Sequence, residues 1–88
     1  MHTQPVSVER LRFRGDVADD AFVDWIDHRV RRLGIDGRIM RRDANEIEVL
    51  AAGPVELIDA MEMACSLGPI SVTVDSVERE PSGTDRRA

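Results

Sequence analysis

The spacing of the apolar residues changes along the chain from the period of a strand to that of a helix, and it does so twice. Leu11 and Phe13 alternate with arginines, whereas from Asp20 onward the apolar residues recur every three or four positions. Alternation is typical of a half-buried strand, and the longer period of a helix with one buried face. We expect Asp19 or Asp20 to cap this helix and Gly34 to end it. The apolar helical positions are Phe22, Trp25, Ile26, Val30 and Leu33.

The second half of the chain repeats the change of period. Apolar runs around Ile39 and over residues 47–50 flank the polar sequence RRDANE, which predicts a hairpin that turns at residues 43–45. Pro54 then precedes apolar residues at helical spacing, and this pattern predicts a helix that ends before Gly68. A last strand is expected in PISVTVDSV, whose alternating residues are Ile70, Val72 and Val74.

The predicted order is therefore strand, helix, strand, strand, helix, strand. Two helices packed on one face of an antiparallel sheet give an α+β ferredoxin-like sandwich, βαββαβ. We expect one domain over residues 7–78, with a flexible N-terminus (1–6) and a flexible charged tail (79–88). Such a fold carries many unrelated functions, so it does not name the activity.

Charge and cysteine content narrow the class of function. The chain has 12 basic and 17 acidic residues, a net charge of -5, which disfavours binding to polyanions. Its single cysteine, Cys65, cannot form an internal disulfide, and no apolar run is long enough for a signal peptide or a membrane span. We expect a cytoplasmic monomer with no cofactor, which binds neither nucleic acid nor membranes. A small anionic ligand or a protein remains as its partner.

Three aspartates, Asp16, Asp19 and Asp20, lie in the turn before the first predicted helix. Clustered carboxylates can hold a divalent cation, but the glycine and terminal glutamate of a calcium loop are missing here. Helix capping and the helix dipole explain Asp19 and Asp20 without a metal. We therefore predict no metal site.

Between Gly15 and Val77 the chain carries glycines and apolar residues at characteristic positions: Gly15, Val17, Phe22, Trp25, Leu33, Gly34, Gly37, Ile39, Gly53, Gly68, Pro69, Val74 and Val77. In these residues the sequence resembles an acylphosphatase. That family has a loop G-x-V-Q-G-V-x-F-R, a helix closing with L-G, the pattern G-x-V-x-N, and a late G-P before the last strand. The resemblance implies the same fold and an ancestor that hydrolysed acyl phosphates.

The resemblance also implies a site. In the family the loop amides cradle a phosphate, the arginine that ends the motif binds its charge, and the asparagine orients the attacking water. Here Val23 stands at the arginine position and Arg41 at the asparagine position. The equivalents of the phosphate loop are Gly15, Ala18 at the glutamine position, Asp19 at a glycine position, Asp20, Ala21 and Phe22. Relative to the family loop, Val23 replaces a fixed cation by a hydrocarbon side chain, and Asp19 and Asp20 add carboxylates. Both changes oppose the binding of an anion.

Our leading hypothesis is a catalytically impaired acylphosphatase-like domain that acts as a noncatalytic binding or regulatory module. The alternative is an active acylphosphatase that hydrolyses the carboxyl-phosphate bond, with Arg41 as a substitute phosphate anchor. Whether Arg41 points into the old pocket or pairs with a neighbouring acid stays open. A third possibility is different chemistry at the aspartates. A group of arginines, expected by default to be solvated, could also meet an acidic partner: Arg29, Arg31, Arg32, Arg38, Arg41 and Arg42.

Overall fold

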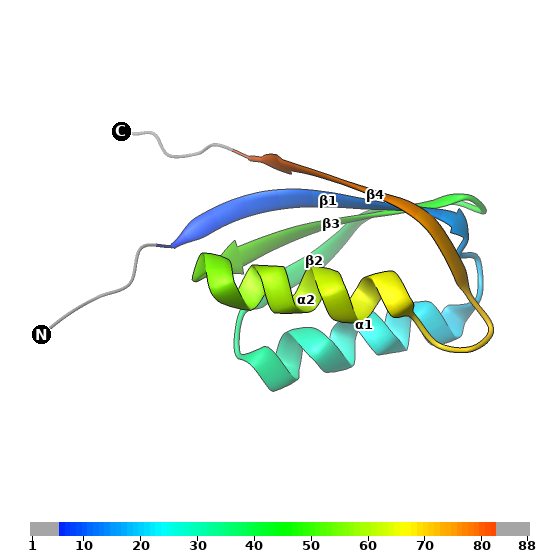
Figure 1. The fold of residues 1–88 in the computed structure, drawn as a ribbon, viewed down its shortest axis with the longest axis horizontal. Coiled ribbons are helices and arrows are strands. Elements are labelled where there is room, and N and C mark those ends of the chain that lie inside the picture. Colours follow the sequence, from blue (N-terminus) through cyan, green and yellow to red (C-terminus); the bar gives the residue numbers. More distant parts are fainter. Residues whose placement is uncertain (1–5, 83–88) are drawn as a thin grey trace, which may run out of the picture.

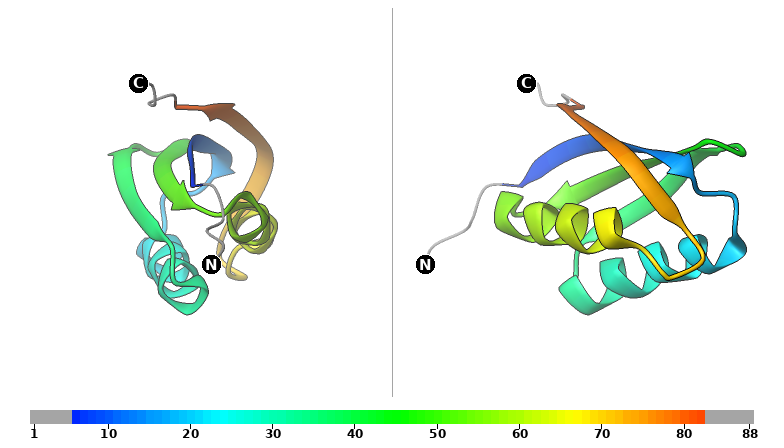
Figure 2. Two further views of the ribbon diagram at one scale, coloured as in Figure 1. Left: turned by 90° about the vertical axis from the view of Figure 1, so that its left-hand side faces the viewer. Right: turned by 45° about the vertical axis from the view of Figure 1, so that its right-hand side comes forward.

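A computed structural model describes residues 6–82 and contains four strands and two helices (Figure 1). Along the chain these are β1 (Ser7–Asp16), α1 (Asp20–Leu33), β2 (Asp36–Arg42), β3 (Glu46–Gly53), α2 (Val55–Leu67) and β4 (Thr73–Pro81). The strands form one antiparallel sheet in the order β2-β3-β1-β4. Both helices cover the same face of this sheet (Figure 2). The predicted α+β ferredoxin-like sandwich is confirmed.

The core lies between the sheet and the two helices. Alternate residues of β1 and β3 point into it, while each helix contributes one stripe of apolar side chains. Phe13 of β1 meets Phe22 of α1 edge to face, with ring centroids 5.9 Å apart. The fully buried large side chains are Phe13, Phe22, Leu11, Ile47, Ile58, Met61, Val17, Val49 and Cys65.

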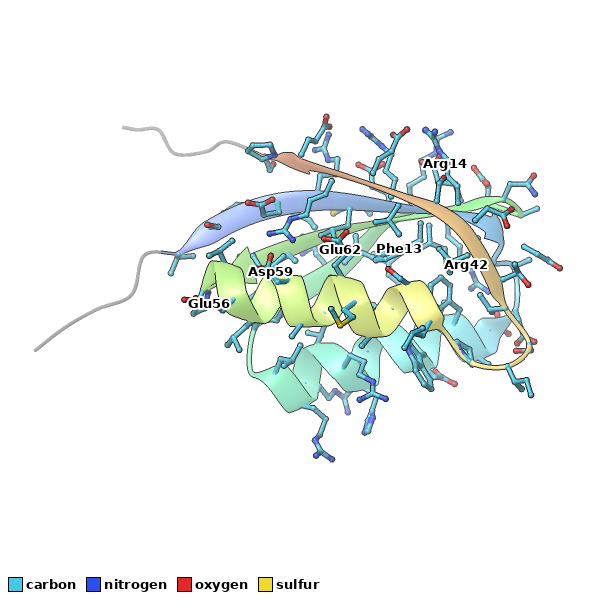
Figure 3. All side chains as sticks on the ribbon, in the orientation of Figure 1. Phe13, Arg14, Arg42, Glu56, Asp59 and Glu62 are labelled. Carbon is cyan, nitrogen blue, oxygen red and sulfur yellow. The ribbon has the colours of Figure 1, made fainter. Side chains whose placement is uncertain are left out.

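The other face of the sheet is covered by paired charges and not by helices. Arg10, Arg12 and Arg14 of β1 form its central row, as their alternation with Leu11 and Phe13 predicts. Arg14, labelled in Figure 3, bonds to Glu46 of β3 and to Glu78 of β4, both at 2.9 Å. These hydrogen bonds raise the pKa of the Arg14 guanidinium. The arginines of this face are thus largely matched by glutamates of the neighbouring strands.

The ends of α1 follow the sequence. Asp19 is the N-cap, and its side chain accepts a hydrogen bond from the Ala21 amide. Gly34 adopts the left-handed conformation, with φ of 70°, and donates its amide to the last turn. The hairpin between β2 and β3 also turns where predicted, at residues 43–45.

The last strand differs from the prediction at both ends. It begins at Thr73, because Val72 donates its amide to Pro69 O (3.0 Å) in a turn that leaves Ile70 fully exposed. The strand ends at Pro81, so 79–81, predicted to belong to the flexible tail, are part of the sheet. Their charges looked solvated in the sequence, but Arg79 points inward to acidic partners. Residues 1–5 and 83–88 of the predicted flexible ends lie outside the described residues.

Within residues 6–82, neither helix has the length and apolar character needed to cross a membrane.

Candidate functional site

The loop that joins β1 to α1 begins at a glycine that the sheet itself requires. Gly15 has a φ of 149°, and a Cβ there would lie 2.2 Å from Thr73 O of β4. The pairing of β1 with β4 shifts register at this point, and the Gly15 amide donates to Asn45 O at 3.0 Å. Only glycine fits so close an approach of two backbones. The first glycine of the family loop therefore has a structural role in this chain.

The carboxylate of Asp19, the N-cap residue, binds the first turn of α1. Its Oδ1 accepts a 2.8 Å hydrogen bond from Ala21 N, while its carbonyl accepts one from Phe22 N at 2.9 Å. The pKa of the Asp19 carboxyl is lowered, first by the Ala21 amide, then by a hydrogen bond with Ser71 and by the charge of Arg42. A negative group at this position also interacts favourably with the helix dipole. An internal anion thus binds a donor that a phosphate loop would offer to its ligand.

Arg42, one of the arginines predicted to be solvated, reaches the loop from β2. Its Nη2 donates to Ala18 O at 3.0 Å and pairs with the Asp20 carboxylate. In Figure 3 the side chain lies on the helix side of the sheet, near the start of α1. The loop therefore contains a cation, but two oxygens of the loop already bind it.

Arg41 lies on the opposite side of the sheet from this loop. Ile39 pairs with Val49 and Arg41 with Glu48, so the extra residue Met40 shifts the register between them. This irregularity turns Arg41 toward the face without helices and turns Arg42 toward α1. The Arg41 side chain is 68% exposed, and its Nε is 4.0 Å from Asp43 Oδ2. Of the two possibilities left open by the sequence, the structure shows the pairing with a neighbouring acid.

Val23, which stands at the position of the family's arginine, packs beside the core and does not face the loop. It is half-buried and lines a groove between α1 and β2 together with Ile26, Val30 and Ile39. The two positions that the family uses for its arginine and asparagine are thus on different faces of this structure. The structure does not bring Val23 and Arg41 together.

The three aspartates of the loop are also separated in their roles. Asp19 caps α1 and Asp20 pairs with Arg42, whereas Asp16 lines an open depression of about 670 Å³ at the end of the sheet. Among the described residues, no three His, Cys, Asp or Glu side chains are grouped so that they could hold a metal ion. The three carboxylates therefore have separate partners and surroundings.

The fold and this loop define a class of protein, a ferredoxin-like sandwich with a glycine-anchored loop before its first helix. The acylphosphatase family model matches residues 9–88, and the chain belongs to that family. An acylphosphatase of Nitrobacter hamburgensis is 34% identical over 74 residues, which cover 84% of this chain and 75% of that protein. An acylphosphatase of Vibrio parahaemolyticus is 35% identical over 75 residues, which cover 85% and 83%.

Solved structures agree on the fold. The chain superposes on an acylphosphatase from Coxiella burnetii with a TM-score of 0.81 at 17% identity, covering 94% of this chain and 87% of that one. An acylphosphatase from Bacillus subtilis gives a TM-score of 0.81 at 20% identity, with coverage of 91% and 88%. The suspected resemblance to this family is confirmed.

Proposed function

We propose that this chain is an acylphosphatase-like module that binds a partner and does not hydrolyse acyl phosphates at the rates of an enzyme. The observation that carries this proposal is the Asp19 carboxylate on the Ala21 amide at the start of α1. A phosphate dianion would have to displace it or lie beside it, and like charges repel at such distances. The site is on the surface, so salt screens this repulsion without removing it.

The missing family groups support the same proposal. Val23 offers no hydrogen-bond donor or charge, and Arg41 faces the other side of the sheet. Loss of one preorganised donor at a charged transition state lowers the rate by about two to three orders of magnitude. Groups that act together do not add simply, but the loss of two leaves little specific catalysis.

The partner is a protein or a small anion, and the protein acts as a cytoplasmic monomer. Nucleic acid is an unsuitable partner because Arg10, Arg12 and Arg14 of the open sheet face pair with glutamates, and because Phe13 and Phe22 are fully buried. Exposed aromatic rings and unpaired cations are what single-stranded nucleic acids need.

The test is hydrolysis of acetyl phosphate and benzoyl phosphate by the purified chain, measured against the uncatalysed rate. We expect no acceleration that scales with protein concentration. The acylphosphatase of Vibrio parahaemolyticus, assayed in parallel, shows whether the assay detects the family's activity. Turnover of the chain comparable with that relative would overturn the proposal.

Active hydrolysis is the second candidate, and one observation favours it: Arg42 places a guanidinium at the loop. If this cation, released from Asp20, held the phosphate, Arg42→Ala would abolish turnover. Arg41→Ala would leave turnover unchanged, since Arg41 lies on the far face. Equal turnover in the two variants would exclude Arg42 as the anchor.

A further inference from the structure

Among residues 6–82, β2 is an edge strand whose outer side pairs with no other strand. It stands at the end of the order β2-β3-β1-β4, and the left view of Figure 2 shows it at the border of the sheet with α1 below it. The outer side of an edge strand presents backbone N–H and C=O groups that another extended chain can pair with. The seven residues Asp36–Arg42 offer about 23 Å of edge at ~3.3 Å per residue. This is long enough for a short peptide strand.

A groove lies directly beneath this edge, between β2 and α1. Its volume is about 210 Å³, its apolar lining residues are Val23, Ile26, Val30 and Ile39, and Asp24, Asp27, Gly37 and Arg38 also line it. A volume of this size would hold roughly seven waters at ~30 Å³ each, or one aliphatic side chain. At one point β2 approaches α1 so closely that a Cβ on Gly37 would lie 2.7 Å from Val30 Cγ2. The edge thus combines free backbone groups with a pocket for a side chain.

The charge of the edge is positive on the face away from the helices. Arg38 is opposite Leu50 and Arg41 is opposite Glu48, and both partners belong to the row of β3 that faces away from the core. Within residues 6–82 Arg38 forms no ion pair, and the nearest carboxylate to Arg41 is that of Asp43, at 4.0 Å. Opposite charges directly across two strands stabilise their pairing. An incoming strand with acidic residues at these positions would complement the edge.

The inner neighbour of β2 shows this pairing at one of the two arginines, since the residue opposite Arg38 is Leu50. Glu48 of β3 is opposite Arg41, and Val49 is opposite Ile39 on the core side. A strand on the outer side meets the same alternation, because successive side chains of β2 point to opposite faces except at Met40. It would place an acidic residue opposite Arg38, an aliphatic residue over the groove beside Ile39, and a second acidic residue opposite Arg41.

We propose that the outer edge of β2 and the α1 groove together bind an extended acidic segment of a partner protein, with an aliphatic residue between two acidic ones. The segment would become a fifth strand of the sheet. This inference rests on the proposed function as a binding module and names the chemistry of its partner. A second copy of the chain fits less well. Two β2 edges would oppose arginine with arginine, and on the β4 edge Arg12 and Arg14 already engage Glu80 and Glu78.

The probe is a capped peptide, Thr-Glu-Val-Glu-Ile-Glu-Thr, titrated into the isotope-labelled full chain and followed by amide chemical shifts. We expect shifts confined to β2 and to the groove side of α1, with slower hydrogen exchange at the β2 amides that face outward. A peptide with lysine in place of glutamate should not bind. A peptide N-methylated at alternate residues, which lacks the pairing N–H groups, should bind at least about tenfold more weakly.

Two variants test the two parts of the site. The double variant Arg38→Glu with Arg41→Glu should weaken peptide binding by about tenfold or more. The control is Arg32→Glu, which makes the same change of charge at one site on the end of α1 and should alter binding by less than about twofold. Val23→Phe should weaken binding by filling the groove without adding charge. Melting curves establish that each variant is folded.

The proposal is overturned if the peptide causes no shifts at about 1 mM, if the Arg38→Glu, Arg41→Glu variant binds equally well, or if the shifts lie outside β2 and α1. Sedimentation of the chain without peptide tests for a second copy, and a dimer that protects the β2 amides would likewise overturn it. Acetyl phosphate hydrolysis is measured on the same samples. If the chain binds the peptide and also hydrolyses acetyl phosphate, only the proposed function is contradicted. If it neither binds the peptide nor hydrolyses acetyl phosphate, only the peptide site is contradicted.

Discussion

Asp19 Oδ1 accepts a 2.8 Å hydrogen bond from the amide of Ala21, so a carboxylate of the chain itself is bound at the N-terminus of α1. The family uses this loop to bind a phosphate, and here an internal negative charge uses one of its amides. Arg42 strengthens the arrangement because it binds both Ala18 O and Asp20. The loop is thereby a structural cap that joins β1, α1 and β2.

Replacing Asp19 by alanine should lower the melting temperature at neutral pH. The folded-state pKa of Asp19 is lowered by the Ala21 amide, so its stabilising effect is present above the pKa of an unfolded aspartate. That effect is lost as the pH falls through the folded pKa, and the melting temperatures of the variant and the parent should converge in acid. Thermal melts from neutral pH downward measure this.

Two controls accompany this series. Asp19→Asn keeps an oxygen that can accept a hydrogen bond from the Ala21 amide. This variant should therefore melt close to the parent at neutral pH, but the contribution of residue 19 to stability should no longer depend on pH. Asp16→Ala changes the same charge at an exposed position that does not cap the helix. A difference between Asp19→Ala and the parent that stays constant into acid would contradict the capping role.

Arg42→Ala should destabilise the protein more than Arg41→Ala. Arg42 joins β2 to the loop, but Asp20 is 89% exposed, so the expected loss in the free energy of unfolding is about 0.5–1 kcal/mol. Within residues 6–82 the nearest acidic partner of Arg41 is Asp43, at 4.0 Å, so Arg41→Ala should cause no measurable loss of stability. Urea unfolding of both variants checks the order, and faster hydrogen exchange at the amides of residues 18–21 in Arg42→Ala would locate the effect. A larger loss in Arg41→Ala would contradict it.

The sequence predicts the elements well because each depends on local chemistry. The apolar period defines β1 and α1, Asp19 and Gly34 define the ends of that helix, and the polar run at residues 43–45 defines the hairpin. The start of β4 was predicted incorrectly because Ile70 continues the alternation of Val72 and Val74. The chain must first turn after α2, and this turn exposes Ile70.

The candidate site was harder to predict because it depends on register. One unpaired residue, Met40, decides that Arg42 and not Arg41 faces the loop, and no local pattern marks such an irregularity. Arg79 was missed for a related reason. An arginine among glutamates looks solvated in a sequence, yet position 79 is opposite Leu11 and so points toward the core side.

Arg79→Leu should destabilise the fold. Arg79 Nε donates to Glu9 at 2.8 Å, and Nη1 donates to Asp59 at 2.7 Å and to Glu62 at 2.8 Å, the last two from α2 (Figure 3). Burial alone would lower the pKa of Arg79, but these hydrogen bonds outweigh it and raise the pKa. Removal leaves the half-buried Glu9 without its partner, and we expect a loss of about 1–2 kcal/mol in urea unfolding. Glu80→Leu, on the exposed face, is the matched control, and an equal loss there would refute the prediction.

Cys65 should be unreactive in the folded protein. Burial raises the pKa of its thiol to about 12, slightly opposed by the charge of Arg29, so the reactive thiolate is scarce at neutral pH. Ellman's reagent should modify Cys65 only after denaturation. Rapid reaction of the native chain would show that α2 opens or that the thiol is accessible.

Restoring the family's charges should restore phosphate binding. The double variant Val23→Arg with Asp19→Gly has a cation in place of a hydrocarbon side chain. Because the Asp19 carboxylate is absent from this variant, the Ala21 amide is free to bind phosphate. Titration with inorganic phosphate should then shift the amides of residues 18–22, which the parent chain should not show. Adding Arg41→Asn should raise acetyl phosphate turnover only if residue 41 can turn toward the loop, because in the present register it faces away. Val23→Gln with Asp19→Gly, which lacks the charge, is the control. Phosphate binding by the parent as tight as by the Val23→Arg variant would show that neither Val23 nor Asp19 weakens the loop.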